Sequence, residues 1–209
     1  MPVRFPRLII AMIDLEQIRK GLAARQPQLL TQQDFRRAAV AMLLREQAGE
    51  TEVLLIRRAE HELDPWSGDL AFPGGGVDPT DRSSQAAAER ETYEEIGLEL
   101  SPQHYLGRSD DLAGAYLSIH IACFVYQLED EVAFRLNGEV VDLFWVPFRT
   151  LLDPARNRLH DFHYRGAGRR HPVIDLSEWS DRPLWGITYR LLENFLGRFE
   201  LSFRHPEHF

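Results

Sequence analysis

The chain has 209 residues, 44% hydrophobic and 27% charged, which is enough for one globular domain with a substantial core. Its 32 acidic residues outnumber its 24 basic residues, and the net charge of −8 argues against nucleic acid or an anionic membrane as the main partner. No stretch is long and apolar enough for a transmembrane helix. The single cysteine, Cys123, lies in an apolar run, which predicts a buried thiol, no internal disulfide and a cytoplasmic location.

The first predicted element is a helix over residues 13–26, because Leu15, Ile18 and Leu22 are spaced to share one face. The residues before it are too few, and too unlike the three-part pattern, for a secretory signal. Met12 is an alternative to the first residue as the native start.

Apolar runs rich in aliphatic, β-branched and aromatic residues predict strands further along the chain. These strands are expected at residues 37–45, 52–58, 115–128, 141–147, 158–164 and 170–175, before a closing amphipathic helix at 184–197. Strands mixed with a few helices favour an α/β fold, as a three-layer α/β/α sandwich with a mixed β-sheet. We therefore expect an N-terminal extension with its helix at 1–34, a main domain at 35–200 and a tail at 201–209.

A glycine-rich turn and a helix lie between the second and third of these strands. Phe-Pro-Gly-Gly-Gly at residues 72–76 excludes a helix or a central strand, and predicts a tight turn whose backbone approaches a ligand. Ser83 or Ser84 caps the helix that follows, and Gly97 ends it.

Three carboxylates on that helix stand at positions i, i+3 and i+4, so Glu91, Glu94 and Glu95 share one face. Charged faces usually point only to solvent. Three carboxylates packed together repel one another, however, and a cation would neutralise them. Hard oxygen ligands on a helix suit Mg²⁺ or Mn²⁺.

The glycine turn followed by the acidic helix resembles the signature of the Nudix (MutT-like) hydrolases, G-x5-E-x7-R-E-U-x-E-E-x-G-U, where U is aliphatic. The second half matches in spacing at Arg90, Glu91, Glu94, Glu95, Gly97 and Leu98. Thr92 stands at an aliphatic position. Counting from Gly75 puts Asp81 at the first acidic position, with eight residues rather than seven before Arg90. Counting from Gly76 restores the spacing but puts Arg82 there, so we favour Asp81 with one inserted residue.

The resemblance implies the α/β/α fold and a role for each matched residue. Glu91, Glu94 and Glu95 would hold divalent metal ions, together with the carbonyl oxygen of Gly74. Arg90 would orient the carboxylates through charge-assisted hydrogen bonds. The reaction implied is attack of a metal-activated water on one phosphorus of a diphosphate.

Two glutamates are candidates for the general base of this reaction. One is Glu91 itself. The other is Glu139, in a turn that feeds the strand ending in Trp-x-Pro at residues 145–147, where family members often carry a functional glutamate. An exposed turn carboxylate without a catalytic role is the alternative for Glu139.

The segment before the glycine turn resembles the coenzyme A pyrophosphatase branch of the family, on Leu54-Leu55, Arg58 and the run from Gly68 to Gly75. Ile56 and Ala59 depart from that branch. The resemblance implies coenzyme A as substrate and 3′,5′-ADP and 4′-phosphopantetheine as products. ADP-ribose, NADH or another nucleoside diphosphate derivative is the alternative substrate, and a non-catalytic nucleotide sensor is the alternative function.

Four residues are candidates for substrate binding. Arg57 and Arg58 would meet phosphates, with a solvated strand end as the alternative. Trp66 would stack on a base, and its alternative is a loop anchor that buries a large aromatic ring. Gly75 would approach the substrate through its backbone. The partner is therefore a small nucleotide, and the sequence leaves the oligomeric state open, with a homodimer as one alternative.

Overall fold

The computed structural model describes residues 13–31, 34–61, 66–115, 117–129, 132–164 and 167–203. In these residues the helices are α1 (Leu15–Ala24), α2 (Ser84–Ile96), α3 (Phe148–Leu151) and α4 (Gly186–Gly197), with short 3-10 turns η1 (Pro102–His104) and η2 (Pro154–Arg156). One mixed sheet contains β1 (Arg36–Gln47), β2 (Glu50–Arg58), β3 (Leu70–Ala71), β4 (Gly74–Gly76), β5 (Tyr105–Arg108), β6 (Leu112–Ala113), β7 (Ile119–Gln127) and β8 (Val140–Pro147). A separate hairpin is formed by β9 (Asn157–Tyr164) and β10 (Ala167–Ile174).

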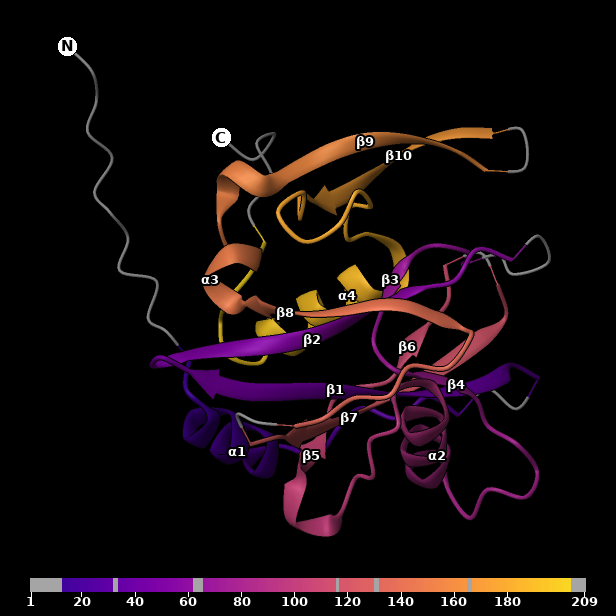
Figure 1. The fold of residues 1–209 in the computed structure, drawn as a ribbon, viewed down its shortest axis with the longest axis vertical. Helices are drawn as coiled ribbons and strands as arrows, with labels where there is room; N and C mark the ends of the chain where they lie inside the picture. The colour runs from indigo at the N-terminus through magenta and orange to yellow at the C-terminus, as the bar shows by residue number, and fades with distance from the viewer. Residues whose placement is uncertain are drawn as a thin grey trace.

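The sheet is built around β1, which pairs in parallel with β7 along most of its length. The opposite edge of β1 is shared, because its C-terminal half pairs with β2 and residues 38–40 pair with β4. β2 in turn pairs with β8 from Glu52 to Arg58, and with β3 at Ile56 and Arg57. This sharing brings the glycine-rich segment next to the centre of the sheet, below the hairpin (Figure 1).

Apolar side chains of β1 alternate between two cores, as expected of a strand buried on both faces. Met42 and Leu44 pack in the core that includes residues of α1, α3 and α4. Ala41 and Leu43 pack in the other core, against α2. The predicted α/β/α sandwich with a mixed sheet is therefore confirmed, and α2 alone covers the second face among the described helices.

Most predicted elements are present, but some limits differ, and the short elements β3, β5, β6 and α3 were not predicted. The strand expected at 115–128 begins only at Ile119. Before it, a turn is closed by a hydrogen bond from the Gly114 N–H to the Ile119 carbonyl at 2.8 Å. The closing helix begins at Gly186 rather than at residue 184. Residues Gly74–Gly76, predicted as a tight turn, instead form the short strand β4, whose only pairing among the described strands is with β1.

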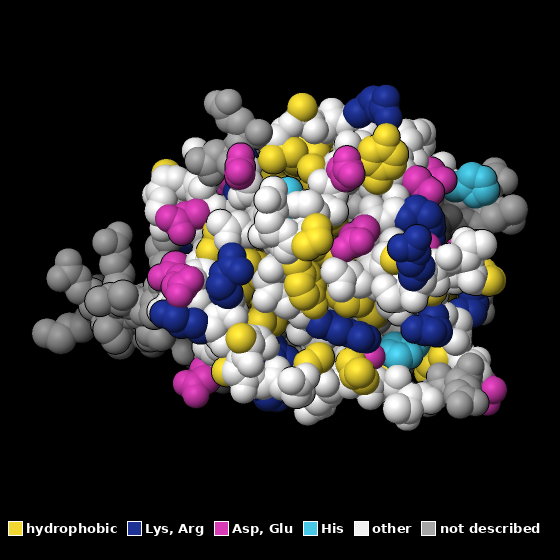
Figure 2. Space-filling view, turned by 90° about the horizontal axis from the view of Figure 1, so that it is seen from below, with side chains coloured by type: hydrophobic (Ala, Val, Ile, Leu, Met, Phe, Trp, Pro, Cys, Tyr) yellow, Lys and Arg dark blue, Asp and Glu magenta, His cyan; other side chains and the backbone are white. Residues whose placement is uncertain are grey.

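Two further expectations concern the thiol and the surface. Cys123 is fully buried, and this burial raises the pKa of its thiol to about 12, which confirms a core role. Figure 2 shows both acidic and basic side chains on the face seen from below, with several basic side chains close together in the right half of the view. None of the helices in the described ranges is long and apolar enough to span a bilayer.

Candidate active site

Helix α2, which carries the three glutamates, is capped at both ends. The Ser83 hydroxyl caps the first turn by accepting the Ala86 N–H at 3.1 Å, so Ser83 is the predicted cap. Gly97 ends the helix in the left-handed region at φ 69°, as predicted. Thr92 is buried and donates its hydroxyl to the Ala88 carbonyl at 2.7 Å, which satisfies a polar group at the position where the signature has an aliphatic residue.

The glycines of β4 allow the turn and the helix to approach each other closely. A Cβ on Gly74, whose φ is +149°, would lie 2.4 Å from the Ala39 carbonyl oxygen. A Cβ on Gly75 would lie 2.6 Å from the carboxylate carbon of Glu91. Because no side chain intervenes, the Gly74 N–H donates directly to Glu95 Oε2 at 2.8 Å.

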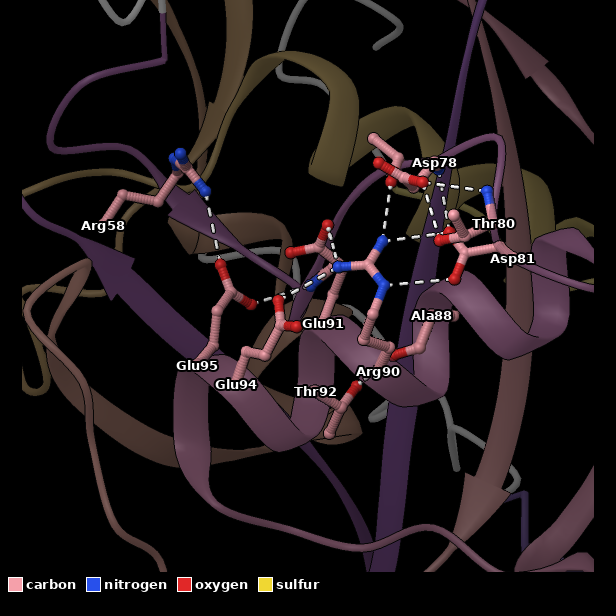
Figure 3. A network of polar contacts seen from close by, with 12 residues as sticks. Arg58, Asp78, Thr80, Asp81, Ala88, Arg90, Glu91, Thr92, Glu94 and Glu95 are labelled. Atoms are coloured by element: carbon pink, nitrogen blue, oxygen red, sulfur yellow. Dashed lines mark hydrogen bonds and ion pairs between the residues drawn. The ribbon is translucent and has the colours of Figure 1, made fainter.

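Arg90 lies at the centre of the acidic network (Figure 3). Its guanidinium donates to both carboxylate oxygens of Asp81, at 3.1 and 3.0 Å, and to Glu91 and Glu94 at 3.0 Å each. The hydrogen bonds from Arg90 hold the pKa of Asp81 below its usual value, and those same bonds raise the pKa of Arg90. Asp81, favoured above for the first acidic position of the signature, therefore pairs with Arg90 despite the extra residue between them.

The extra residue is accommodated in a turn before the helix. The Asp81 N–H donates to the Asp78 carbonyl at 3.0 Å, while the Asp78 N–H donates to Asp81 Oδ2 at 2.8 Å. Asp78 also accepts the N–H and the hydroxyl of Thr80. These reciprocal bonds fix the Asp81 carboxylate toward Arg90.

Glu95 is almost fully buried, with 1% of its surface exposed. Burial raises the pKa of its carboxyl to about 7, against the opposing effects of the Gly74 N–H and the Arg58 guanidinium, which lies 3.5 Å from Glu95 Oε1. Burial also raises the pKa of Glu91, although Arg90 acts in the opposite direction. The site therefore holds two carboxylates that burial disfavours as anions and that a nearby positive charge would stabilise.

Glu139 lies in an exposed turn next to this site. Its carbonyl accepts the Ala59 N–H at 2.7 Å, and its own N–H donates to the Asn137 side chain at 2.8 Å. The charge of Glu139 raises the pKa of both Glu91 and Glu95, after the larger effect of burial. The fold therefore brings Glu139 close enough to Glu91 and Glu95 for its charge to affect their pKa values.

The donor chemistry of this site suits a divalent cation. Glu91 and Glu95 are carboxylates in a partly buried site, beside a turn that has no side chains to obstruct an ion. Among the residues that the structure describes, however, no group of three His, Cys, Asp or Glu side chains converges on one point as metal ligands do. Glu94 turns to Arg90 and Glu95 turns to Gly74 and Arg58, so arginines supply the compensating charge in this arrangement.

The four predicted substrate-binding residues occupy different environments. Arg58 faces Glu95, and Gly75 faces Glu91. Arg57, by contrast, forms an ion pair with Asp181 at 2.9 Å. Trp66 is half-buried and packs against the core on the α4 face of the sheet. The fold therefore brings Arg58 and Gly75 to the acidic helix, and directs Arg57 to the segment before α4.

The packing of Trp66 favours a loop anchor over a stacking residue. Its carbonyl accepts the Asp69 N–H at 3.1 Å, just before β3 and the glycine turn. Trp66→Ala is therefore expected to lower Tm, because a large aromatic contact is lost, and to change KM for all substrates together. Thermal unfolding and steady-state kinetics check this. A rise in KM for one substrate only, in a protein of unchanged Tm, would assign Trp66 to base recognition instead.

A sandwich in which a glycine turn packs on an acidic, arginine-bridged helix defines a class of hydrolases that act on phosphoanhydrides. The NUDIX domain model matches residues 34–165 of this chain. The chain belongs to the Nudix hydrolase family, whose members generally use divalent metal ions. Its activity is therefore that of a Nudix hydrolase on nucleoside diphosphate derivatives.

Similar proteins agree with this assignment. The chain is 33% identical over 146 residues to the "Uncharacterized Nudix hydrolase NudL" of Yersinia pestis (strain Pestoides F), covering 69% of this chain and 71% of that protein. The protein of the same name from Yersinia pseudotuberculosis serotype O:1b matches equally well. The crystal structure of a MutT/nudix family protein from Enterococcus faecalis superimposes with a TM-score of 0.56 over 90% of this chain and 70% of its own, at 15% identity, and so supports the fold.

Proposed function

We propose that the protein hydrolyses the diphosphate of coenzyme A, giving 3′,5′-ADP and 4′-phosphopantetheine, with Mg²⁺ or Mn²⁺ bound by Glu91, Glu94, Glu95 and the carbonyl of Gly74. The observation that carries this proposal is the close contact of the glycine turn with the buried carboxylate of Glu95 and the partly buried carboxylate of Glu91. A bound divalent ion would neutralise charge on the diphosphate and make water a better nucleophile. The single buried thiol fits a cytoplasmic location, and we keep 35–200 as the catalytic domain.

The residues of this chain have separate roles in the proposed reaction. Arg90, bound to Asp81, holds Glu91 and Glu94 in orientation. Arg58 lies at the site edge, where its guanidinium can bind a phosphate oxygen of the substrate. Water attacks one phosphorus of the diphosphate, and either Glu91 or Glu139 accepts its proton. The leaving group departs as the second phosphate ester.

A substrate panel with Mg²⁺ or Mn²⁺ and identified products tests the proposal. The panel contains coenzyme A, ADP-ribose, NADH, dinucleoside polyphosphates and nucleoside triphosphates. We expect the highest kcat/KM for coenzyme A, with the two products named above. A higher kcat/KM for ADP-ribose or NADH would reassign the substrate within the family, and metal-dependent binding without turnover of any member would favour a nucleotide sensor.

Glu95→Gln is expected to weaken Mn²⁺ binding while the metal-free fold stays intact or becomes more stable. The amide oxygen of Gln can still accept the Gly74 N–H, and the substitution removes an anion whose charge burial disfavours. Titration with Mn²⁺ and thermal unfolding of the metal-free protein measure the two effects. Unchanged Mn²⁺ affinity would remove Glu95 from the metal site.

A further inference from the structure

Residues 179–185 lie between the β9–β10 hairpin and α4, and we call this segment the strap. Its side chains contact the segment that runs from the end of β2 to β3. The contacts are Asp181 with Arg57 at 2.9 Å, Arg182 with Glu60 at 2.7 Å, and Trp185 Nε1 with Asp69 Oδ1 at 2.8 Å. The strap is therefore joined at three places to the chain that leads into the glycine turn.

These three contacts differ in strength. Asp181 is 70% exposed, and Arg182 and Glu60 are both largely exposed, so water and salt screen their ion pairs. The Trp185–Asp69 hydrogen bond is partly buried, so water and salt screen it less than they screen the two exposed ion pairs. Trp185 is thus the residue by which the strap acts on the loop.

Trp185 is itself held firmly. Its indole stacks on Phe162 of β9, with ring centroids 3.9 Å apart and an interplanar angle of 14°. The preceding residue, Leu184, exchanges two backbone hydrogen bonds with Ile174 of β10, at 2.8 and 3.0 Å. The position of the indole N–H is therefore set by the hairpin rather than by the loop that it contacts.

Asp69 stands between the two groups that contact Glu95. Its carbonyl accepts the Arg58 N–H at 3.1 Å, and the side chain of Arg58 reaches Glu95 Oε1. In the other direction, the chain continues through β3 to Gly74, whose N–H donates to Glu95 Oε2. A shift of Asp69 would therefore move both Arg58 and Gly74, the two groups that contact Glu95.

We propose that Trp185 is a positioning residue of the active site, which sets the places of Arg58 and Gly74 against Glu95 through its hydrogen bond to Asp69. The kinetic effect of Trp185 rests on the proposed function, whereas its effect on the positions of Arg58 and Gly74 does not depend on any substrate. The hairpin then serves as the support for the glycine turn, and none of the residues labelled in Figure 3 belongs to it.

Three variants and one control separate this role from a general effect on stability. Trp185→Phe removes the indole N–H but keeps an aromatic ring on Phe162, and Asp69→Ala removes the acceptor. Asp69→Asn retains a side-chain carbonyl that can accept the bond. Arg182→Gln, the control, weakens an exposed contact of the same strap without touching Asp69.

We expect kcat/KM to fall about tenfold in Trp185→Phe and in Asp69→Ala, at a temperature where both remain folded, with no further loss in the double variant. Asp69→Asn should lose less than Asp69→Ala, and Arg182→Gln should match the wild type. Mn²⁺ affinity should fall in the first two variants alone. The proposal would be overturned if folded Trp185→Phe kept the kcat/KM and the Mn²⁺ affinity of the wild type. It would also be overturned if Arg182→Gln lost as much kcat/KM as Trp185→Phe, in proportion to its fall in Tm.

Amide hydrogen exchange of the metal-free proteins keeps the two proposals distinguishable. Exchange at Arg58 and Gly74 should be faster in Trp185→Phe than in the wild type and unchanged in Arg182→Gln. If the wild type hydrolyses no diphosphate, the proposed function fails, and the exchange rates still decide the positioning role. Equal exchange in wild type and Trp185→Phe would contradict that role whatever the substrate.

Discussion

Glu91→Gln is expected to lower kcat by at least about a hundredfold, the scale of losing a general base or a group that orients it. The carboxylate of Glu91 bonds to Arg90 of α2 and lies against Gly75 of β4. Of the two candidate bases, Glu91 is therefore the one in contact with both the acidic helix and the glycine turn. Because Gln keeps the shape and removes a charge that burial disfavours, Tm should be kept. Steady-state kinetics with a saturating divalent metal measure the effect.

The same measurement on Glu139→Gln distinguishes the two candidate bases. Glu139 acts on the site through its charge, from an exposed turn, so its loss should cost less than that of Glu91 if Glu91 is the base. If Glu139→Gln is crippled and Glu91→Gln keeps most of its activity, the base is Glu139.

Gly75→Ala should cost activity on a similar scale while leaving the protein folded. The added Cβ would lie within 2.7 Å of both carboxylate oxygens of Glu91, and that flexible side chain, rather than the backbone, would move aside. A displacement of about 1 Å in a catalytic group can cost about a hundredfold in rate. Thermal unfolding and kcat measure the two quantities.

Gly76→Ala is the matched control in the same strand. A Cβ at Gly76 would meet no atom within 4 Å, and only its backbone contributes to the Arg90 network. Its kcat should stay near that of the wild type. Equal losses in the two variants would indicate that the strand, rather than the position of Glu91, limits activity.

The sequence predicted the parts of the site that depend on local spacing. The shared face of Glu91, Glu94 and Glu95 follows from helical geometry, and the helix limits follow from Ser83 and Gly97. The glycine segment was predicted as a turn because glycine and proline rarely occur in strand interiors. Its pairing with β1 depends on an edge that β2 leaves unpaired, which only the assembled sheet provides.

Contacts between distant segments were outside the reach of that reasoning. Asn137 donates its N–H to the carbonyl of Glu95 at 3.0 Å, and Trp185 reaches Asp69 across 116 residues. No periodicity or motif spacing encodes either contact, since both arise from tertiary packing. Asp81 was favoured for the first acidic position against the usual spacing, but its pairing with Arg90 depends on the turn at Asp78, which accommodates the extra residue.

Cleavage of acetyl-coenzyme A in ¹⁸O-enriched water tests the central claim most directly, because the substrate offers both a diphosphate and a thioester. Mass spectrometry of the products locates both the cleaved bond and the label. Attack of water on phosphorus predicts ¹⁸O in a phosphate group of one product, an intact thioester, and no reaction when the divalent metal is chelated. Release of acetate with the diphosphate intact, or label on carbon, would contradict the account.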